Sequence, residues 1–115
     1  GGVALLSASE AVKALKLSGE EAIGAEIILK ACQAPLKQIA ENTGFDGSVV
    51  LSDVLKAGKN YGFNALTEKV EDLLQAGVID PAKVVISALT HANSAAGIVL
   101  ISEALIVDAE EDNDA

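Results

Sequence analysis

Arginine, tryptophan and methionine are absent from the 115 residues, aromatic residues make up only 3%, and there is one cysteine. Because all eight basic residues are lysines, the chain has no guanidinium group that could clamp a phosphate in bidentate fashion. The net charge of −9 also has the wrong sign for binding nucleic acid or an anionic membrane surface. With Cys32 as its only cysteine, the sequence excludes an internal disulfide and a cysteine-rich zinc site. We expect Cys32 to be a small core residue.

Long uninterrupted apolar runs are also missing. No stretch reaches the roughly 18 apolar residues of a membrane span, and no segment has the layout of a signal peptide. We therefore expect a soluble protein that is compatible with a reducing compartment. Hydrophobic residues nevertheless form 50% of the chain, and the mean hydropathy is +0.39. Since a small domain leaves much of its surface in water, this composition predicts apolar surface that meets other parts of the same protein or a neighbouring subunit.

Acidic residues gather at the C-terminal end, where five of the 17 fall within residues 108–115. Residues 1–107 carry the other 12 acidic residues against eight lysines. We expect residues 1–107 to form one domain segment. Residues 108–115 should be an acidic, disordered tail rather than a metal site.

Apolar residues recur at three- and four-residue spacing, which predicts a mainly all-α, multi-helix bundle. The first helix is expected over residues 3–16. A capping box at Ser18 and Glu21 should begin a second helix. Pro35 should kink that helix or restart it near residue 34. Its inward face should carry four apolar residues: Ile23, Ile27, Ile28 and Ala31.

Turn and cap residues divide the second half of the chain. Ser48 should cap a short helix that ends near residue 58. Asn64 should cap a helix to about residue 75, with Gly77 as its left-handed C-cap. Asp80, followed by Pro81 at the first helical position, should cap a last helix to about residue 103. Short β pieces are expected near residues 61–64, 78–80 and 105–108.

Two features are candidates for a small-molecule site by chemistry alone. Asn64 and Asp80, at the mouths of adjacent helices, would either line one site or act only as caps. Gly1 and Gly2 precede a helix and present bare N–H groups, which would let a ligand approach closely. The alternative for the two glycines is a plain helix lead-in.

Other polar residues carry weaker signals. His91 has no second ligand at metal-binding spacing, so we expect a surface or core histidine. The carboxylates of Glu68, Glu71 and Asp72 are expected on a solvated helix face. No nucleophile and base, and no metal-ligand set, can be assembled from the sequence.

Several motifs occur in the order found in one protein family. They read GGVALL, APLKQIAENTG, NYGFNA, AGVIDPAKV and SAL, and they are spread over residues 1–89. The chain resembles the group I chaperonins, the 60 kDa ATP-driven protein-folding rings. The similarity is to the C-terminal part of the nucleotide-binding equatorial domain.

The resemblance implies a fragment of an ATP-dependent molecular chaperone that supplies the adenine and ribose side of an ATP/ADP site. Catalytic residues are not expected in this segment, because the family's phosphate loop and catalytic aspartates belong to other segments. The chain alone should therefore not hydrolyse ATP. Mg²⁺ and K⁺ are expected only in the full-length parent. The implied nucleotide-binding residues are Gly1, Ile39, Asn64, Ala65, Leu66, Val78 and Asp80.

The resemblance also implies partners. They are other subunits of the same chaperonin in stacked rings, with co-chaperonin and non-native polypeptides bound by other domains, in the cytoplasm or an organellar matrix. Four residues would face the opposite ring: Lys37, Asp46, Ser48 and Val49. The alternative is an all-helical protein-interaction module without nucleotide binding.

Overall fold

The computed structural model describes residues 1–104 and 106–109. It divides into two units, Gly1–Ile79 and Asp80–Ala115, which are considered separately below. The described part of the chain is mainly helical, with one small two-stranded sheet, and the predicted fold class is confirmed. The first unit contains α1 (Val3–Lys13), α2 (Glu20–Asn42), α3 (Gly47–Ala57), β1 (Tyr61–Asn64), β2 (Lys69–Asp72) and α4 (Leu73–Ala76).

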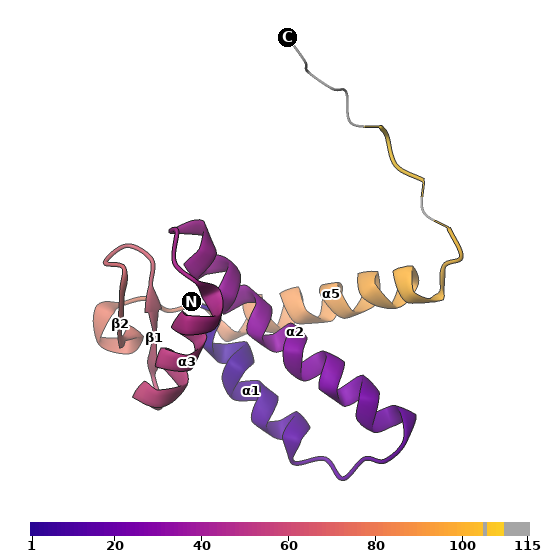
Figure 1. Ribbon diagram of the computed structural model, residues 1–115, viewed down its shortest axis with the longest axis horizontal. Helices are drawn as coiled ribbons and strands as arrows, with labels where there is room; N and C mark the ends of the chain where they lie inside the picture. The colour runs from indigo at the N-terminus through magenta and orange to yellow at the C-terminus, as the bar shows by residue number, and fades with distance from the viewer. Residues whose placement is uncertain (105, 110–115) are drawn as a thin grey trace. The chain divides into compact units, whose positions relative to one another are not determined.

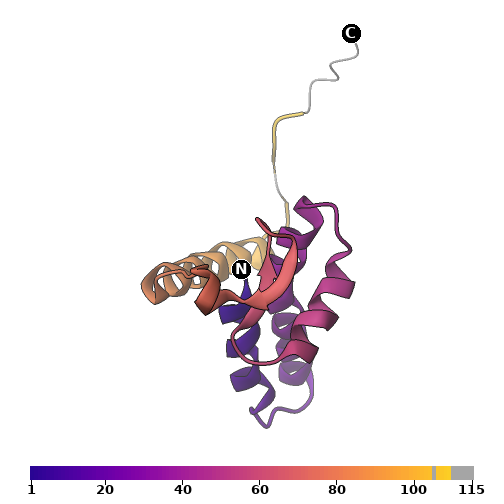
Figure 2. The same cartoon turned by 90° about the vertical axis from the view of Figure 1, so that its left-hand side faces the viewer.

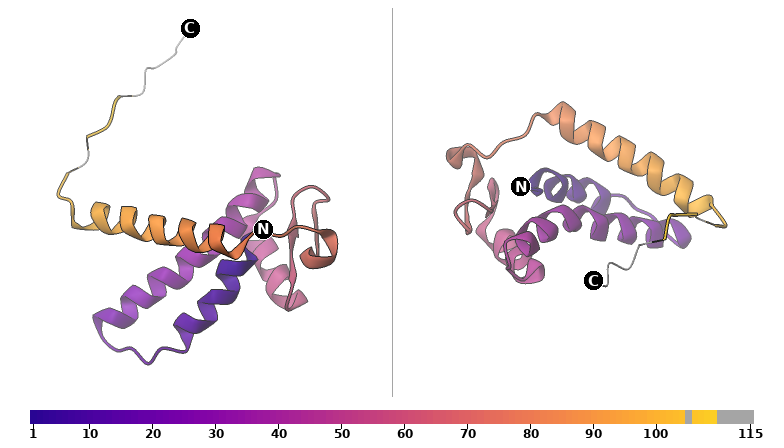
Figure 3. Two further views of the ribbon diagram at one scale, coloured as in Figure 1. Left: turned by 180° about the vertical axis from the view of Figure 1, so that it is seen from behind. Right: turned by 90° about the horizontal axis from the view of Figure 1, so that it is seen from above.

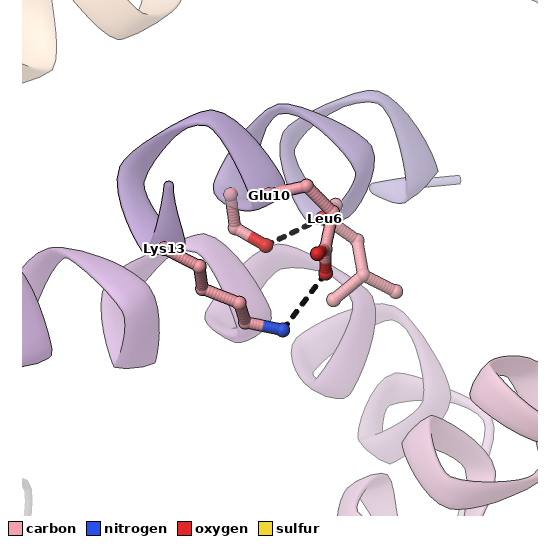
Figure 4. Close-up of polar contacts among 4 residues, drawn as sticks. Leu6, Glu10 and Lys13 are labelled. Atoms are coloured by element: carbon pink, nitrogen blue, oxygen red, sulfur yellow. Dashed lines mark hydrogen bonds and ion pairs between the residues drawn. The ribbon is translucent and has the colours of Figure 1, made fainter. Parts of the chain in front are cut away.

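Helices α1 and α2 form a helical hairpin, joined by the loop that Figure 1 and the left panel of Figure 3 show at its far end. Helix α1 ends at Lys13, three residues before the expected end, and Leu15 lies 58% exposed in the loop. Its last turns are held by local contacts, in which the Lys13 ammonium lies 2.8 Å from the Glu10 carboxylate and the Ser9 hydroxyl donates to the Leu6 carbonyl (Figure 4). The ion pair is exposed, so it stabilises the helix by at most about 1 kcal/mol.

Helix α2 differs from its prediction at its start and at Pro35. The N-cap residue is Gly19, which has no side chain to cap with, so the capping box of Ser18 and Glu21 is wrong. Pro35 lies inside one continuous helix from Glu20 to Asn42 rather than at a restart. Leu36, next to the proline, is fully buried, and this packing keeps the chain helical although Pro35 has no N–H to donate.

The buried face of α2 is also not the expected one. Cys32, Leu36 and Ala40 are buried, which confirms the core position of the cysteine. These residues follow one i, i+4 row, and α2 packs against both α1 and α3. Periodicity identifies which residues share a face, but both faces of α2 are apolar. The four residues expected to point inward are exposed: Ile23, Ile27, Ile28 and Ala31.

Helix α3 is capped by Asp46 rather than by Ser48. The Asp46 carboxylate accepts hydrogen bonds from the Ser48 N–H at 2.9 Å and the Val49 N–H at 3.1 Å. Gly58 ends the helix with a φ of 99°, close to the predicted boundary. Helix α3 lies against α2 and the sheet, and the core contains Leu36, Ala40, Val50, Leu51, Val54 and Phe63.

A β-hairpin replaces the helix that was predicted over residues 64–75. Strands β1 and β2 pair antiparallel (Figure 2). In their register Tyr61 lies opposite Asp72 and Asn64 opposite Lys69. The four turn residues between them end at Glu68, whose φ is 57° and whose N–H donates to the Asn64 carbonyl at 2.7 Å. Phe63 fills the core under the hairpin and meets the Phe45 ring at 5.5 Å between centroids. The apolar spacing of residues 66–74 suggested a helix, but the buried Phe63 and the turn decide in favour of strands.

Helix α4 is a single short turn after β2. The Asp72 carboxylate caps it by accepting from the Gln75 N–H at 3.1 Å. Gly77 ends it in the left-handed conformation, with a φ of 76°, as predicted. The solvated helix face expected from Glu68, Glu71 and Asp72 is therefore wrong, because these carboxylates belong to a turn, a strand and a cap. Residues 78–80, expected to be β, are irregular.

The second unit contains α5 (Ala82–Ile101). Its N-cap residue is Pro81, one residue after the predicted Asp80 cap, and it ends two residues before the expected position. Residues 106–108 are irregular rather than β, and residue 105 lies outside the described residues, as does most of the predicted acidic tail. By length and composition alone α5 is apolar enough to cross a membrane, which the sequence did not lead us to expect. Helices of soluble proteins that pack against other segments share this composition.

Candidate functional site

The glycines at the start of the chain lie beside the hairpin. Gly1 is so close that a Cβ placed on it would be 2.9 Å from Leu73 Cδ1 and 3.6 Å from the Phe63 carbonyl oxygen. Gly2 has a φ of 76°, and a Cβ there would be 2.7 Å from the Leu36 backbone nitrogen. Both positions therefore depend on the absence of a side chain. The structure thus brings Gly1 next to β1 and α4, although 60 residues of chain separate them.

Asn64 ends β1 and is only 6% exposed. It does not cap a helix, so the predicted capping role is wrong. Its Oδ1 accepts from the Leu66 N–H at 3.0 Å, and its Nδ2 donates to Glu71 Oε1 at 2.6 Å. Both ends of the amide are therefore engaged within the hairpin. One Nδ2 hydrogen and one Oδ1 lone pair are left for any further contact.

The turn that follows Asn64 supplies exposed surface. Ala65 is exposed and the Leu66 side chain is 93% exposed, so this turn presents an apolar group with no partner in its own unit. Ile39, on α2, is half-buried and packs against the core. Val78, directly after Gly77, is half-buried, and its N–H donates to the Leu73 carbonyl at 2.9 Å.

Asp80 begins the second unit and is exposed. Its carboxylate precedes Pro81 and the first turn of α5. An exposed carboxylate is an acceptor suited to a ligand that offers two O–H donors. The predicted site residues of the first unit are Gly1, Ile39, Asn64, Ala65, Leu66 and Val78.

The four residues expected at a contact between rings gather at the start of α3. Asp46 holds the N–H groups of Ser48 and Val49, and the Val49 side chain is 58% exposed. Lys37, on α2, lies beside them, because a Cβ on Gly47 would be 2.9 Å from Lys37 Cβ. The structure therefore unites these residues on one end of the α2–α3 pair, although it holds no second subunit.

An open groove of about 630 Å³ lies between α3 and the hairpin, and no pattern in the sequence indicated it. The aromatic pair of Phe45 and Phe63 forms part of its wall. Its lining is separate from the residues expected to touch a nucleotide. The lining consists of Phe45, Val50, Asp53, Lys56, Ala57, Phe63, Glu68, Lys69 and Val70.

Two residues next to Asn64 have contacts that the sequence did not predict: Thr67, which carried no signal, and Glu71, which was expected on a solvated helix face. The Thr67 hydroxyl donates to Glu71 Oε1 at 2.9 Å, the same oxygen that accepts from Asn64. In the register of the hairpin Glu71 lies opposite Gly62 and diagonal to Asn64 on the same face. The sequence does contain two four-residue strands around a four-residue turn. The proximity of Glu71 to Asn64 can be inferred from it only if residues 69–72 are taken as a strand.

No metal site is evident in the described part of the chain. Within residues 1–104 and 106–109, no three His, Cys, Asp or Glu side chains are grouped so that they could hold an ion. His91 lies exposed on α5. The arrangement in the first unit can therefore offer apolar surface, glycine backbone and one anchored amide to a ligand.

Comparison with known proteins identifies the family of the chain. The sequence profile of the TCP-1/cpn60 chaperonin family matches residues 1–110. The chain is 65% identical over 114 residues, 99% of its length, to the protein named Chaperonin GroEL 3 of Protochlamydia amoebophila (strain UWE25). It spans 21% of the length of that relative. The chain belongs to the TCP-1/cpn60 chaperonin family.

Proposed function

We propose that this chain forms the adenosine side of an ATP site in an ATP-dependent chaperone. The observation that carries the proposal is the position of Gly1 beside Phe63 and Leu73, next to the strand that ends in Asn64. Two motifs that lie far apart in the sequence, and that both belong to the chaperonin resemblance, thus meet in one unit.

The residues fit the chemistry of an adenosine group. The exposed Leu66 side chain, with Ile39 and Val78, offers apolar surface for the faces of a base. The anchored amide of Asn64 and the backbone of Ala65 offer polar groups to its edge. Asp80 offers a charged acceptor for the two hydroxyl groups of a ribose, which makes hydrogen bonds stronger than those of a neutral acceptor.

The chain does not supply the phosphate side of such a site. A phosphate loop, the carboxylates that activate water, and Mg²⁺ and K⁺ would belong to the full-length parent, where the bound metal would neutralise phosphate charge. Gly1 and Gly2 would contribute by letting the ligand come close to the start of α1. We expect the chain by itself to be inactive in ATP hydrolysis.

The parent is proposed to assemble into rings and to fold non-native polypeptides in a capped cavity. Lys37, Asp46, Ser48 and Val49 would face the opposite ring. Co-chaperonin and non-native polypeptides would bind to other domains, and the protein would act in the cytoplasm or, alternatively, in an organellar matrix. The exposed apolar side chains of α2 favour extensive contacts with further protein segments, whether or not a nucleotide is bound.

Substitution of Asp80 tests the ribose contact. In the full-length protein, we expect Asp80→Ala to weaken binding of a fluorescent ATP analogue by about tenfold to a hundredfold, because a hydrogen bond to a charged group is worth about 1.5–3 kcal/mol. Asp108→Ala is the matched control, since it removes the same charge from an exposed position in the same unit. Equilibrium titration gives both affinities.

The competing ligand separates the ribose contact from a general loss of charge. ATP should compete better than its 2′,3′-dideoxy analogue against the unsubstituted protein, and the two should become equal in the Asp80→Ala variant. An ATP affinity that stays within twofold of the original in that variant would contradict the proposed role of Asp80.

A further inference from the structure

The amide of Asn64 is held at both ends by the hairpin. Oδ1 accepts from the Leu66 N–H at 3.0 Å, while Nδ2 donates to Glu71 Oε1 at 2.6 Å. Thr67 Oγ1 donates to the same carboxylate oxygen at 2.9 Å. The side chain of Glu71 is thereby tied from two directions, and Asn64 is 6% exposed.

This network admits only one orientation of the amide. A rotation by 180° would place Asn64 Oδ1 against the carboxylate of Glu71, so that two acceptors would face each other. It would also place Nδ2 against the Leu66 N–H, so that two donors would face each other. Because a buried group without a partner costs about 1–3 kcal/mol, the rotated form is strongly disfavoured.

The orientation determines which atom faces the exposed turn. Oδ1 lies at the Leu66 end of the amide, where Ala65 and Leu66 are exposed, and Nδ2 lies at the Glu71 end, across the strand pair. A ligand that reaches Asn64 from the turn therefore meets an acceptor. The remaining lone pair of Oδ1 can receive one hydrogen.

We propose that Glu71, supported by Thr67, is a positioning residue that fixes the Asn64 amide and makes the site select a 6-aminopurine over a 6-oxopurine. The selection rests on the proposed adenosine-binding function. The amino group of adenine donates to Oδ1, whereas the carbonyl oxygen of guanine opposes it. A site built to bond a donor rejects an analogue that lacks it, because its own polar group is then left without a partner.

Position 71 lies between two of the motifs that carry the family resemblance, NYGFNA and AGVIDPAKV, and belongs to neither. The role of Glu71 follows from the hairpin register, in which it is the diagonal neighbour of Asn64. Its carboxylate can only accept hydrogen bonds, so it bonds to the amino end of the Asn64 amide and not to the oxygen end.

The test is the ratio of ATP to GTP affinity in the full-length protein. Glu71→Gln keeps the shape of the side chain but can accept as well as donate, so that only the Leu66 N–H still opposes the rotated amide. We expect this variant to lose part of the ATP preference, by up to about tenfold. Glu68→Gln removes the same charge three residues earlier in the hairpin, where the side chain is exposed, and should leave the ratio unchanged.

A paired substitution provides a rescue. Asn64→Asp alone places two carboxylates where Nδ2 and Oε1 now lie 2.6 Å apart, so the thermal midpoint and ATP affinity should both fall. Combined with Glu71→Gln, the reversed pair can bond again, with the glutamine donating to the aspartate. The double variant should regain the thermal midpoint and a preference for ATP over GTP, since the carboxylate introduced at position 64 would present only acceptors.

The outcomes separate positioning from a merely structural role. If Glu71→Gln lowers the thermal midpoint and weakens ATP and GTP equally, Glu71 only stabilises the hairpin and the inference is overturned. If Asn64→Ala weakens ATP binding while Glu71→Gln keeps the original ratio, adenosine binding stands and the positioning role fails. If Asn64→Ala binds ATP as well as the unsubstituted protein does, the proposed Asn64 contact itself is wrong, and the inference falls with it.

Discussion

Single side chains determine where the short elements of this chain begin. Asp46 begins α3 and Asp72 begins α4, each by accepting backbone N–H groups of the first turn. From sequence alone the α3 cap was predicted at Ser48, two residues late. Both Asp and Ser are good cap residues, so their order along the chain does not decide between them. The N–H groups of the first helical turn, which have no partners within the helix, determine which of the two side chains acts as the cap.

The identity of the α3 cap gives a prediction at this scale. Asp46→Ala should lower the free energy of unfolding by about 1 kcal/mol, because the N–H groups of Ser48 and Val49 lose their acceptor. Ser48→Ala, at the residue that the sequence suggested, should change it by less than about 0.5 kcal/mol. Urea titration followed by circular dichroism measures both. A larger effect from Ser48→Ala than from Asp46→Ala would contradict the observed cap.

The sequence pointed to Gly1 and Gly2 as candidate site residues, but it did not show why both positions require glycine. The bare N–H groups of Gly1 and Gly2 suggested ligand access. The structure adds a packing reason, since the Leu73 side chain and the Leu36 backbone occupy the space where side chains would lie. Such a requirement depends on residues far along the chain, so no local pattern could contain it.

At the scale of elements, residues 61–76 show the limit of periodicity. Leu66, Val70, Leu73 and Leu74 have helical spacing, but the structure places them in a turn, a strand and the start of α4. Phe63 and Val70 face each other across the strand pair, and Phe63 is 3% exposed. Tertiary burial of this pair outweighs the local preference. The boundaries at Gly58 and Gly77 were predicted correctly because glycine adopts the positive φ found there without steric cost.

Helix α2 gives a prediction about Pro35. The ring removes one N–H from the interior of the helix, and the helix nevertheless continues to Asn42. Pro35→Ala should restore the bond to the Ala31 carbonyl and raise the free energy of unfolding by about 1–3 kcal/mol, less the entropy that proline removes from the unfolded chain. Hydrogen exchange of the alanine amide, together with urea titration, measures the gain. A loss of stability would show that the packing of Leu36 and Ala40 requires the proline.

At the scale of the whole molecule, composition was the better guide. The high hydrophobic content predicted apolar surface for other protein segments, and large apolar side chains are indeed exposed on both units. The family predicted from the order of the motifs was confirmed, because motifs can be recognised in a sequence without knowledge of the fold. The choice of the inward face of α2 failed, because it depends on which neighbour covers the helix. The most exposed examples outside the turn are Ile23, Ile27, Leu74, Ile79, Ile86, Ile98, Leu100, Ile101, Ile106 and Val107.

This exposure predicts self-association of the 115-residue chain. At tens of micromolar, sedimentation velocity should show oligomers whose proportion falls on dilution, since each exposed apolar side chain gains about 1.5–3 kcal/mol when it is buried. A variant with Ile23→Gln and Ile27→Gln on α2 should shift the distribution towards monomer. A stable monomer of the unsubstituted chain at these concentrations would contradict the view that its apolar faces are contact surfaces.

Photoaffinity labelling shows whether this segment binds the adenosine part of ATP. The full-length protein would be irradiated with 2-azido-ATP, and the labelled peptides would be identified by mass spectrometry. We expect labelling within residues 61–79, at or next to the turn at residues 64–66, and protection by excess ATP but not by GTP. Protectable labelling confined to the groove residues Phe45–Ala57, or to peptides outside this chain, would contradict it.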